Sequence, residues 1–487
     1  MPSYTPKVES GLTRGRFLQR SLLALSSAGI YGLVDGLAAP AARAFAHHSA
    51  RPGPEQHLLQ NVRQLSENGV EVLIPPLHHQ IVTANLRVGR SKAALHEARR
   101  TLEGALATID RTYAPTPSGL GLTVGWSRRY FEDRLPRLAG GRRYPDYLPV
   151  DHRASQAAGE HRAGLLDAIR FPSDPDDVVL EHNDVCFLFR SDVLAHVEQA
   201  SQHLFHDVHG MFDITSIRKG FVGGGLEDGV GLPKKMATQA RIPGAELMPD
   251  AAQLFLGFTS TQKRALGPGL IANTETLPGL TDQWPNGYFR HGTTMHVSHI
   301  HEDLETWYAS FSYIRRVWAT FRPSIDVPDG TLTVPQGSDT VQTVADVTYD
   351  ARNVKLIGHS GAMQPVSRLT AETRDNYGVH NPGGTSMIQR ADFNTLDNPF
   401  FWSSRPKLDR MSKAPAAGLH FDAFAATSDS YHRVRLAMDG RYPGGVTTPL
   451  SPHAEEQGLN SVLRTTHRQN FLVPPRAHRS FPLSELL

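Results

Sequence analysis

The sequence predicts an α+β protein in which helices pack on one face of mostly antiparallel sheets. Segments that alternate like strands are followed by segments with apolar residues at helical spacing, which is the pattern of such layers. The same plan occurs twice along the chain. With 487 residues the chain is also too long for one hydrophobic core, so two domains plus tails are expected.

The first copy of the plan occupies the first half of the chain. Residues 80–88 (QIVTANLRV) alternate like a half-buried strand, and residues 91–113 have the apolar spacing of a helix. Residues 121–133 (GLTVGWSRRYFED) predict a strand, a turn and a short helix. Residues 184–192 (DVCFLFRSD) predict another strand, and a helix follows in residues 193–208.

The second copy repeats this order. Residues 293–300 (TTMHVSHI) predict a strand and residues 301–318 a helix, and residues 418–427 (GLHFDAFAAT) predict a strand followed by a helix in 428–438. The boundary between the copies is expected near Leu247 to Gln253. Two unrelated α+β domains would give the same periodicity, because periodicity alone does not prove a repeat.

The N-terminus has the pattern of an export signal in residues 1–46. A basic run from Thr13 to Arg20 precedes a short apolar run and a stretch of small residues, with a cleavage position after Ala46. The run is similar to a twin-arginine signal, although Gly15 stands where the second arginine is usual. Asp35 interrupts the apolar run, so no stable membrane insertion is expected after cleavage. A disordered or loosely packed N-terminal helix is the alternative.

The remaining boundaries follow from these patterns. We expect a linker in residues 47–74, a first domain in 75–248, a second domain in 249–445 and an extended, proline-rich C-terminal tail in 446–487 that wraps the body. Exported protein would be periplasmic, envelope-bound or extracellular.

Charge and cysteine content exclude several classes of function. The net charge is +2 and 20% of the residues are charged, so the chain has no bias towards nucleic acid. Its one cysteine, Cys186, excludes an intrachain disulfide and every cysteine-based zinc or iron–sulfur site. A metal would therefore need His, Asp or Glu ligands or a prosthetic group.

One glycine-rich loop carries a pair of carboxylates. Residues 220–237 read GFVGGGLEDGVGLPKKMA, with Glu227 and Asp228 among the glycines. The loop lacks the Gly-Lys-Ser/Thr end of a phosphate loop and the ligand spacing of a calcium loop. Glycines let a backbone approach a bulky ligand closely, so an acid or base held at a ligand face is one interpretation. A solvated hairpin with Asp228 capping a turn is the other.

This loop resembles a signature of the dye-decolourising (DyP-type) haem peroxidases. Gly220-Phe221 and Asp228 to Pro233 are similar to that family's Gly-Phe-x-Asp-Gly-x-x-Asn-Pro, with GGGL inserted and Leu232 in place of the asparagine. The predicted strands at 121–133, 184–192 and 418–427 and the segment GTTMHVSHIHEDLETWY also resemble family landmarks and occur in the family's order. The resemblance spans roughly residues 75–440.

The resemblance implies two ferredoxin-like domains, as in the dimeric α/β-barrel-like superfamily, with haem b in the second domain. Residues 359–366 (HSGAMQPV) are similar to the family's His-x-Arg-x-x-Asn-Pro-Arg, so His359 is implied as the axial ligand of the haem iron, although both arginines are gone. The resemblance also implies that Phe221, Gly225 and Gly229 lie against the haem.

A distal arginine is implied in residues 387–393 (MIQRADF), where Arg390 occupies the family's position. By the same resemblance, Asp228 would take the proton from one oxygen of hydrogen peroxide and return it to the other, and Arg390 would stabilise the developing charge. The expected function is a haem-dependent peroxidase that uses an organic electron donor. A homo-oligomer is possible.

A rival arrangement of ligands lies in the predicted strand at 293–300 and just after it. His299 and His301 share one face of such a strand, and His296 lies on the other. With Glu302 or Asp303, two histidines could bind Fe(II) or Zn(II). Two further alternatives are an exported haem- or metal-binding protein of the same fold that lacks peroxidase turnover, and a non-catalytic partner-binding protein.

Overall fold

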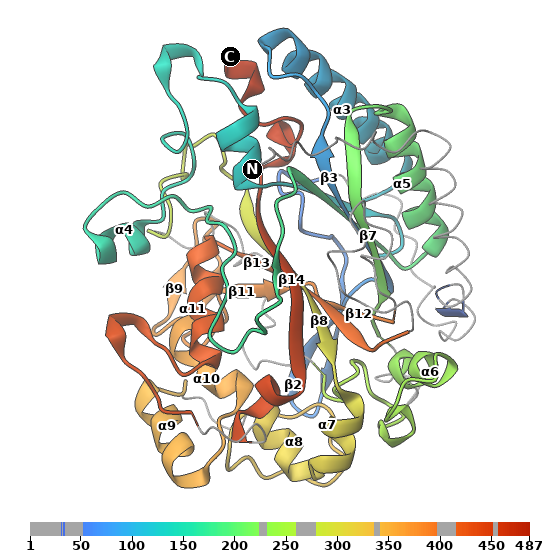
Figure 1. Cartoon of the computed structure of the whole chain (residues 1–487), viewed down its shortest axis with the longest axis vertical. Coiled ribbons are helices and arrows are strands. Elements are labelled where there is room, and N and C mark those ends of the chain that lie inside the picture. Colours follow the sequence, from blue (N-terminus) through green and yellow to red (C-terminus); the bar gives the residue numbers. More distant parts are fainter. Residues whose placement is uncertain are drawn as a thin grey trace, which may run out of the picture.

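A computed structural model describes residues 31, 33–34, 52–223, 231–259, 279–335, 341–396, 415–450 and 456–487. Strands run through the middle of the molecule and helices flank them on either side (Figure 1). The predicted α+β class, with antiparallel sheets and packed helices, is confirmed.

The first half follows the β-α-β-β-α-β order of a ferredoxin-like domain. Its elements are β3 (His78–Leu86), α3 (Lys92–Thr112), β4 (Gly121–Trp126), β6 (Val185–Ser191), α5 (Leu194–Asp207) and β7 (Phe212–Phe221). The strands lie in the order β7-β3-β6-β4 and every pair is antiparallel. Helix α3 begins at Lys92 because the Ser91 side chain accepts a hydrogen bond from the Ala94 amide.

The second half has the same strand order, with the second strand split in two. Its strands lie in the order β11/β12-β13-β8-β14, all antiparallel. Its elements are β8 (Thr293–Glu302), α7 (Leu304–Ser310), α8 (Tyr313–Thr320), α9 (Val344–Tyr349), α10 (His359–Ser367), β11 (Ile388–Arg390), β12 (Phe393–Thr395), β13 (Gly418–Ala425), α11 (Ser428–Met438) and β14 (Leu463–Val473).

The two sheets join edge to edge and close into a ring of strands. On one side β12 pairs with β7 through Asn394 and Phe221, and on the other β14 pairs with β4 through Leu472 and Trp126. The approach of β12 to β7 needs Gly220, because a Cβ there would lie 2.1 Å from the Asn394 carbonyl oxygen. The two halves therefore form one closed structure.

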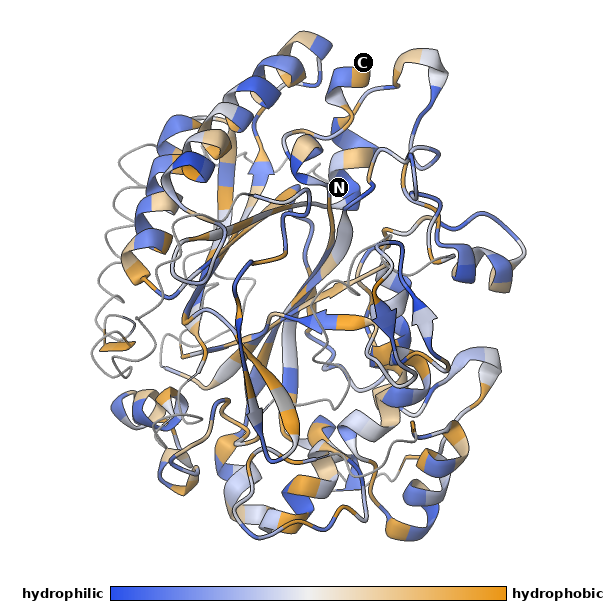
Figure 2. Ribbon diagram, turned by 180° about the vertical axis from the view of Figure 1, so that it is seen from behind, coloured by the Kyte–Doolittle hydropathy of each residue, from blue (hydrophilic) through white to orange (hydrophobic). Residues whose placement is uncertain are grey.

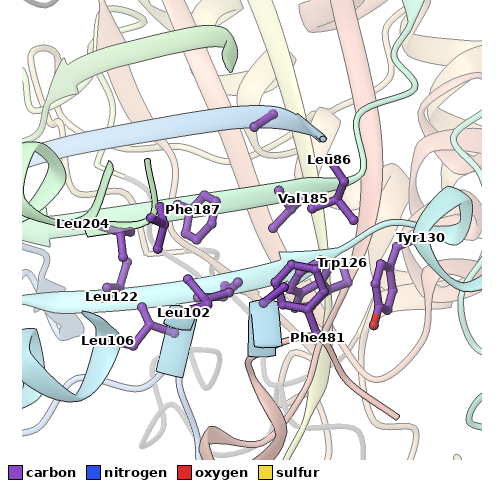
Figure 3. Close-up of a cluster of buried hydrophobic side chains, with 14 of the residues drawn as sticks. Leu86, Leu102, Leu106, Leu122, Trp126, Tyr130, Val185, Phe187, Leu204 and Phe481 are labelled. Carbon is purple, nitrogen blue, oxygen red and sulfur yellow. The ribbon is translucent and has the colours of Figure 1, made fainter. Parts of the chain in front are cut away.

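Apolar side chains fill both the inside of this ring and the outer face of the first half. The inner cluster draws on strands from both halves and includes Ile81, Leu188, Met295, Phe393, Phe424 and Phe471. On the outer face, α3 and α5 pack on β3, β4 and β6 around Phe187, Trp126 and Leu102 (Figure 3). Apolar and polar residues alternate along α3 and α5, as expected for helices with one buried face (Figure 2).

The remaining regular elements are short. They are β1 (Arg63–Glu67), β2 (Val70–Ile74), α4 (His152–Ala158), β5 (Val179–Leu180), α6 (Leu232–Gln239), β9 (Thr373–Arg374) and β10 (His380–Asn381). Within the described ranges, no helix has the length and apolar content needed to cross a bilayer.

The structure differs from the sequence prediction at both ends of the body. Part of the expected linker 47–74 is an antiparallel hairpin of β1 and β2. The expected tail 446–487 is not simply an extended wrapper, because it contains β14, which pairs with β8 and closes the ring. The predicted helix 301–318 is two helices, since Ser312 caps a second helix by accepting a hydrogen bond from the Arg315 amide.

Candidate functional site

A cavity lies between the sheet of the second half and the helices that cover it. Strands β8, β11, β13 and β14 form one wall, and α8, α10 and α11 contribute to the other. The apolar lining includes Leu256, Phe258, Phe321, Met363, Leu419 and Phe421. A few polar side chains converge on this apolar space, which is the usual composition of a ligand site.

His359 faces the cavity from the first position of α10. Two glycines hold this helix end close to the rest of the domain. A Cβ at Gly358 would lie 2.3 Å from the Phe321 carbonyl oxygen, and one at Gly361 would lie 1.9 Å from the Gln342 side-chain oxygen. The Gly361 amide donates to the same Phe321 carbonyl oxygen at 2.7 Å. The sequence around His359 therefore fixes where its side chain enters the cavity.

The His359 imidazole is neutral and has a free lone pair. Burial, together with the charges of Arg390 and Arg435, lowers the pKa of His359 to about 3. Within the described residues, its side chain makes no hydrogen bond or ion pair. A neutral imidazole without a partner at an apolar cavity has the character of a metal ligand.

Arg390 faces the same cavity from the sheet. It is the last residue of β11, opposite Ala423 of β13. In the part of the chain that the structure describes, its guanidinium has no hydrogen-bond or ion-pair partner. Its charge also contributes, after burial, to lowering the pKa of Arg368 to about 10. The sheet side of the cavity is thus able to hold an anionic group.

Two carboxyl groups, Glu302 and Asp392, also line the cavity. Glu302 ends β8, and Asp392 lies in the short connection between β11 and β12. Burial, followed by the charge of Asp392, raises the pKa of Glu302 to about 8. The cavity therefore combines a neutral imidazole, two arginines (Arg390 and Arg435) and a carboxyl group that keeps its proton at neutral pH.

The structure brings together only some of the residues that the sequence singled out. His359 and Arg390 line one cavity, as the resemblance implied. Asp228, Gly225 and Gly229 lie outside the described residues. Phe221 is not in the cavity lining: its ring centroid lies 6.1 Å from that of Phe255, in the apolar cluster that also contains the lining residues Phe258 and Phe321.

The rival metal ligands do not converge. His296 stacks on Tyr431 with ring centroids 3.5 Å apart and hydrogen-bonds to Asn470, whereas His299 bonds to Thr466 from the other face. Asp303 caps α7 by accepting from the Thr306 amide. Among the residues described, no group of three or more His, Cys, Asp or Glu side chains could hold a metal ion.

Sequence reasoning missed the part that Glu302 and Asp392 play in the cavity. Glu302 appeared in the sequence only as a possible metal ligand. The strand period carried the missing signal, because Ile300 and Glu302 share one face of β8 and both line the cavity. Asp392 sits two residues after Arg390 and could have been found in the same way.

The cavity has a volume of about 160 Å³. An apolar cavity of about 150 Å³ holds a molecule the size of benzene. A porphyrin is considerably larger, so its binding would require the apolar side chains of the lining to move apart. The donor set fits an iron porphyrin, and the volume has to increase to admit one.

Together, the fold and the site define an α+β protein whose second half holds a helix-covered ligand cavity. A family model described as a family of unknown function (DUF7405) matches residues 76–475, and the chain belongs to this family. No curated protein matches the sequence.

Several solved structures are similar to the chain at low identity. Ferric DtpA from Streptomyces lividans is 14% identical, with a TM-score of 0.49 over 90% of this chain and 96% of that one. A DyP-type peroxidase from Cellulomonas bogoriensis is 16% identical, with a TM-score of 0.48 over 87% and 96%. DyPB from Rhodococcus jostii RHA1 is 13% identical, with a TM-score of 0.47 over 88% and 98%.

Proposed function

We propose that the cavity binds haem b through His359 and that the protein is a haem-dependent peroxidase, which reduces hydrogen peroxide at the expense of an organic electron donor. The observation that carries the proposal is the His359 imidazole, which is neutral, lacks a partner among the described residues and faces an apolar cavity. Haem iron takes such an imidazole as its axial ligand. When bound, haem would supply the redox chemistry towards peroxide.

The other polar residues of the cavity support this assignment. Arg390 offers a guanidinium without a partner among the described residues, which can stabilise negative charge on a peroxide oxygen. The apolar lining excludes water, which strengthens that interaction. Asp228, in the glycine-rich loop, is proposed from the motif resemblance as the group that moves the proton between the two oxygens.

A second candidate is a haem-binding protein that does not turn over peroxide. Metal-bound histidines almost always donate their second ring N–H to a carboxylate, a carbonyl or water, and this bond orients the ring and raises its basicity. In the described part of the chain, His359 has no protein group of this kind. A less basic axial ligand favours binding over catalysis, and this observation keeps the second candidate.

The first experiment asks whether haem binds. Protein produced with haem supplied is expected to show a Soret absorption band. His359→Ala is expected to lose it, because the axial ligand is gone. His380→Ala is the matched control, since His380 is half-exposed on β10 and bonds to Glu372. An unchanged band in His359→Ala would show that another residue holds the iron.

The second experiment separates the two candidates. Peroxide-dependent oxidation of a dye is measured on haem-loaded wild type, Asp228→Asn and Arg390→Leu. The peroxidase proposal expects turnover in the wild type and a loss of roughly 100-fold or more in each variant, the usual contribution of one proton-transfer group or one charge-stabilising donor. A loaded wild type without turnover would favour the second candidate.

Export through the N-terminal signal belongs to the same proposal. Its support is the basic, apolar and small-residue order of residues 13–46. Protein recovered from the periplasm or the culture medium is expected to begin near His47. Recovery of the full-length chain from the cytoplasm alone would contradict export.

A further inference from the structure

Glu302 is a buried carboxyl group that faces the cavity, and among the described residues its Oε2 atom has no partner. Its side chain is 3% exposed and lines the cavity. Its Oε2 atom is buried and has no hydrogen-bond partner. The Glu302 backbone is held in place by a bond from its amide to the Ala417 carbonyl oxygen at 3.0 Å. A fully buried polar atom that is left unpaired is costly, and such atoms are commonly satisfied by a ligand or by ordered water.

The charged and titratable groups around Glu302 come from several elements. Asp392 and Arg390 line the cavity from the β11–β12 region, and His359 lines it from α10. Arg435 and Tyr431 line it from α11, and Arg435 is already paired with Asp174 and Asp439. Tyr308 of α7 is near enough for the Glu302 charge to contribute to raising its pKa.

We propose that Glu302 and Asp392 act as one acid–base unit, which holds a single proton at neutral pH and presents it from Glu302 to an oxygen atom of the cavity's ligand. On transfer, the O–H bond of the Glu302 carboxyl breaks and an O–H bond forms on the ligand. Glu302 is left as a carboxylate in the cavity that Arg390 also lines, and no electrons are exchanged. In this route Asp228 releases to solvent the proton that it takes from the other peroxide oxygen, and solvent returns one proton to Glu302 by way of Asp392, so the step is neutral in protons. The proton-sharing pair does not depend on haem, whereas the ligand, hydrogen peroxide, rests on the proposed function.

Electrostatics explain why the proton stays on Glu302. Its pKa is raised to about 8, first by burial and then by the negative charge of Asp392. Two neighbouring carboxyl groups in a shielded site cannot both ionise easily, so the more buried one keeps the proton. Asp392 is less buried than Glu302 and can exchange protons with solvent.

The same sheet provides a matched control. Asp422 on β13 is also fully buried and, within the described residues, lacks hydrogen bonds at both oxygens; its pKa is raised to about 8, first by burial and to a smaller extent by the charge of Asp392. Its neighbour Phe421 lines the cavity, so Asp422 points to the opposite face, into the ring of strands. The two carboxyls have similar titration but different access to the ligand.

The first test uses the protein without haem. Infrared difference spectra are recorded as the pH rises through 8, for wild type, Glu302→Gln, Asp422→Asn and Glu305→Gln, which replaces an exposed carboxylate on α7. We expect a protonated-carboxyl band to disappear in the wild type. Glu302→Gln and Asp422→Asn should each remove part of the protonated-carboxyl band, and Glu305→Gln should leave the band unchanged. Asp392→Asn should lower the midpoint of the Glu302 part. A full band in Glu302→Gln, or an unmoved midpoint in Asp392→Asn, would overturn the pair.

The second test uses haem-loaded protein. Peroxide-dependent dye oxidation is expected to fall in the wild type as the pH rises through 8, because the transferable proton is lost. Glu302→Gln should be slower by roughly 100-fold and flat in that range, because an amide cannot transfer the proton. Asp422→Asn should keep the wild-type profile. Wild-type pH dependence in Glu302→Gln would overturn the transfer step.

The two tests distinguish failure of this inference from failure of the proposed function. If wild type never retains haem, the proposed function fails and the infrared titration alone decides whether the proton-sharing pair exists. If haem is retained and peroxide is turned over, but the Glu302→Gln profile equals that of wild type, the proposed function stands and the transfer step fails.

Discussion

The two halves of the molecule share one strand order but differ in what lies between sheet and helices. In the first half, α3 and α5 pack directly on the sheet, and Phe187 and Trp126 lie in the space between them (Figure 3). Phe205 belongs to the same cluster. The centroids of the Phe187 and Phe205 rings are 5.3 Å apart. In the second half, α10 and α11 cover the sheet with a cavity between them.

This difference shows that the same strand order is compatible with a packed or an open space between the sheet and its helices. Large aromatic side chains close the interlayer space of the first half. At the corresponding place in the second half, polar side chains such as His359, Arg390 and Glu302 face open space. Two halves with one strand order can therefore differ in how their interlayer space is packed, and the binding role that we propose belongs to the half with the open space, since function depends on the site and not on the fold.

The largest effect is expected at the seam that joins the halves. Gly220→Ala would place a Cβ 2.1 Å from the Asn394 carbonyl oxygen and 2.3 Å from a ring carbon of Phe393. The backbone of β7 or β12 would have to move, so we expect a loss of roughly 5 kcal/mol or more of unfolding free energy. Chemical denaturation measures it.

Gly104→Ala is the control for this substitution. Gly104 lies in the middle of α3, and a Cβ there would meet nothing within 4 Å. The alanine should stabilise the protein by about 1 kcal/mol, because glycine is a poor helix former. A Gly220→Ala protein as stable as wild type would mean that the ring of strands is not closed at β7 and β12.

A smaller loss of unfolding free energy is expected when an aromatic side chain between the helices and the sheet of the first half is removed. Phe187→Ala leaves a void in a close-packed core and should cost roughly 3 to 5 kcal/mol. Met363→Ala removes a side chain that already borders open space, so its cost should stay below about 2 kcal/mol. Equal losses in the two variants, measured by urea unfolding, would contradict the contrast between the halves.

Most of the fold could be predicted because its strands and helices have strong periods of their own. The segments at 80–88, 184–192 and 418–427 became β3, β6 and β13 within a few residues. Strand β14 was missed because its sequence, LRTTHRQNFLV, is largely polar, although all but its first two residues are buried. Its side chains are satisfied by hydrogen bonds such as the one from Gln469 to Asn183, which no periodicity reveals.

The site was only partly predictable, for a related reason. His359 and Arg390 were found through motif resemblance, and the structure places both at one cavity. Glu302 is far from both in sequence, and its neutral state depends on burial and on Asp392. Such properties come from packing, so residue types alone could not supply them. The roles of His359, Arg390 and Asp228 and the positions of the domain boundaries remain predictions.

The smallest effect concerns how the free energy of unfolding depends on pH. Buried histidines and buried carboxyl groups change it in opposite directions. Burial holds the pKa of several histidines well below 6.5, so the unfolded chain binds more protons and stability rises with pH up to about 6.5. These are His57, His79, His296, His299, His359, His420 and His432. The carboxyls Glu302 and Asp422, raised to about 8, act in the opposite direction, because the folded protein binds more protons between 4.5 and 8.

Below pH 6.5 these histidines outnumber the two carboxyls, and above it the contribution of the histidines ends while that of Glu302 and Asp422 continues, so wild-type stability should peak near pH 6.5. Each carboxyl should then cost on the order of 1 to 2 kcal/mol between pH 6.5 and 8. Glu302→Gln removes one of these contributions and should flatten the decline. Thermal unfolding of wild type and Glu302→Gln across this range measures the difference, and a decline as steep in the variant as in wild type would mean that Glu302 is already ionised in the folded protein.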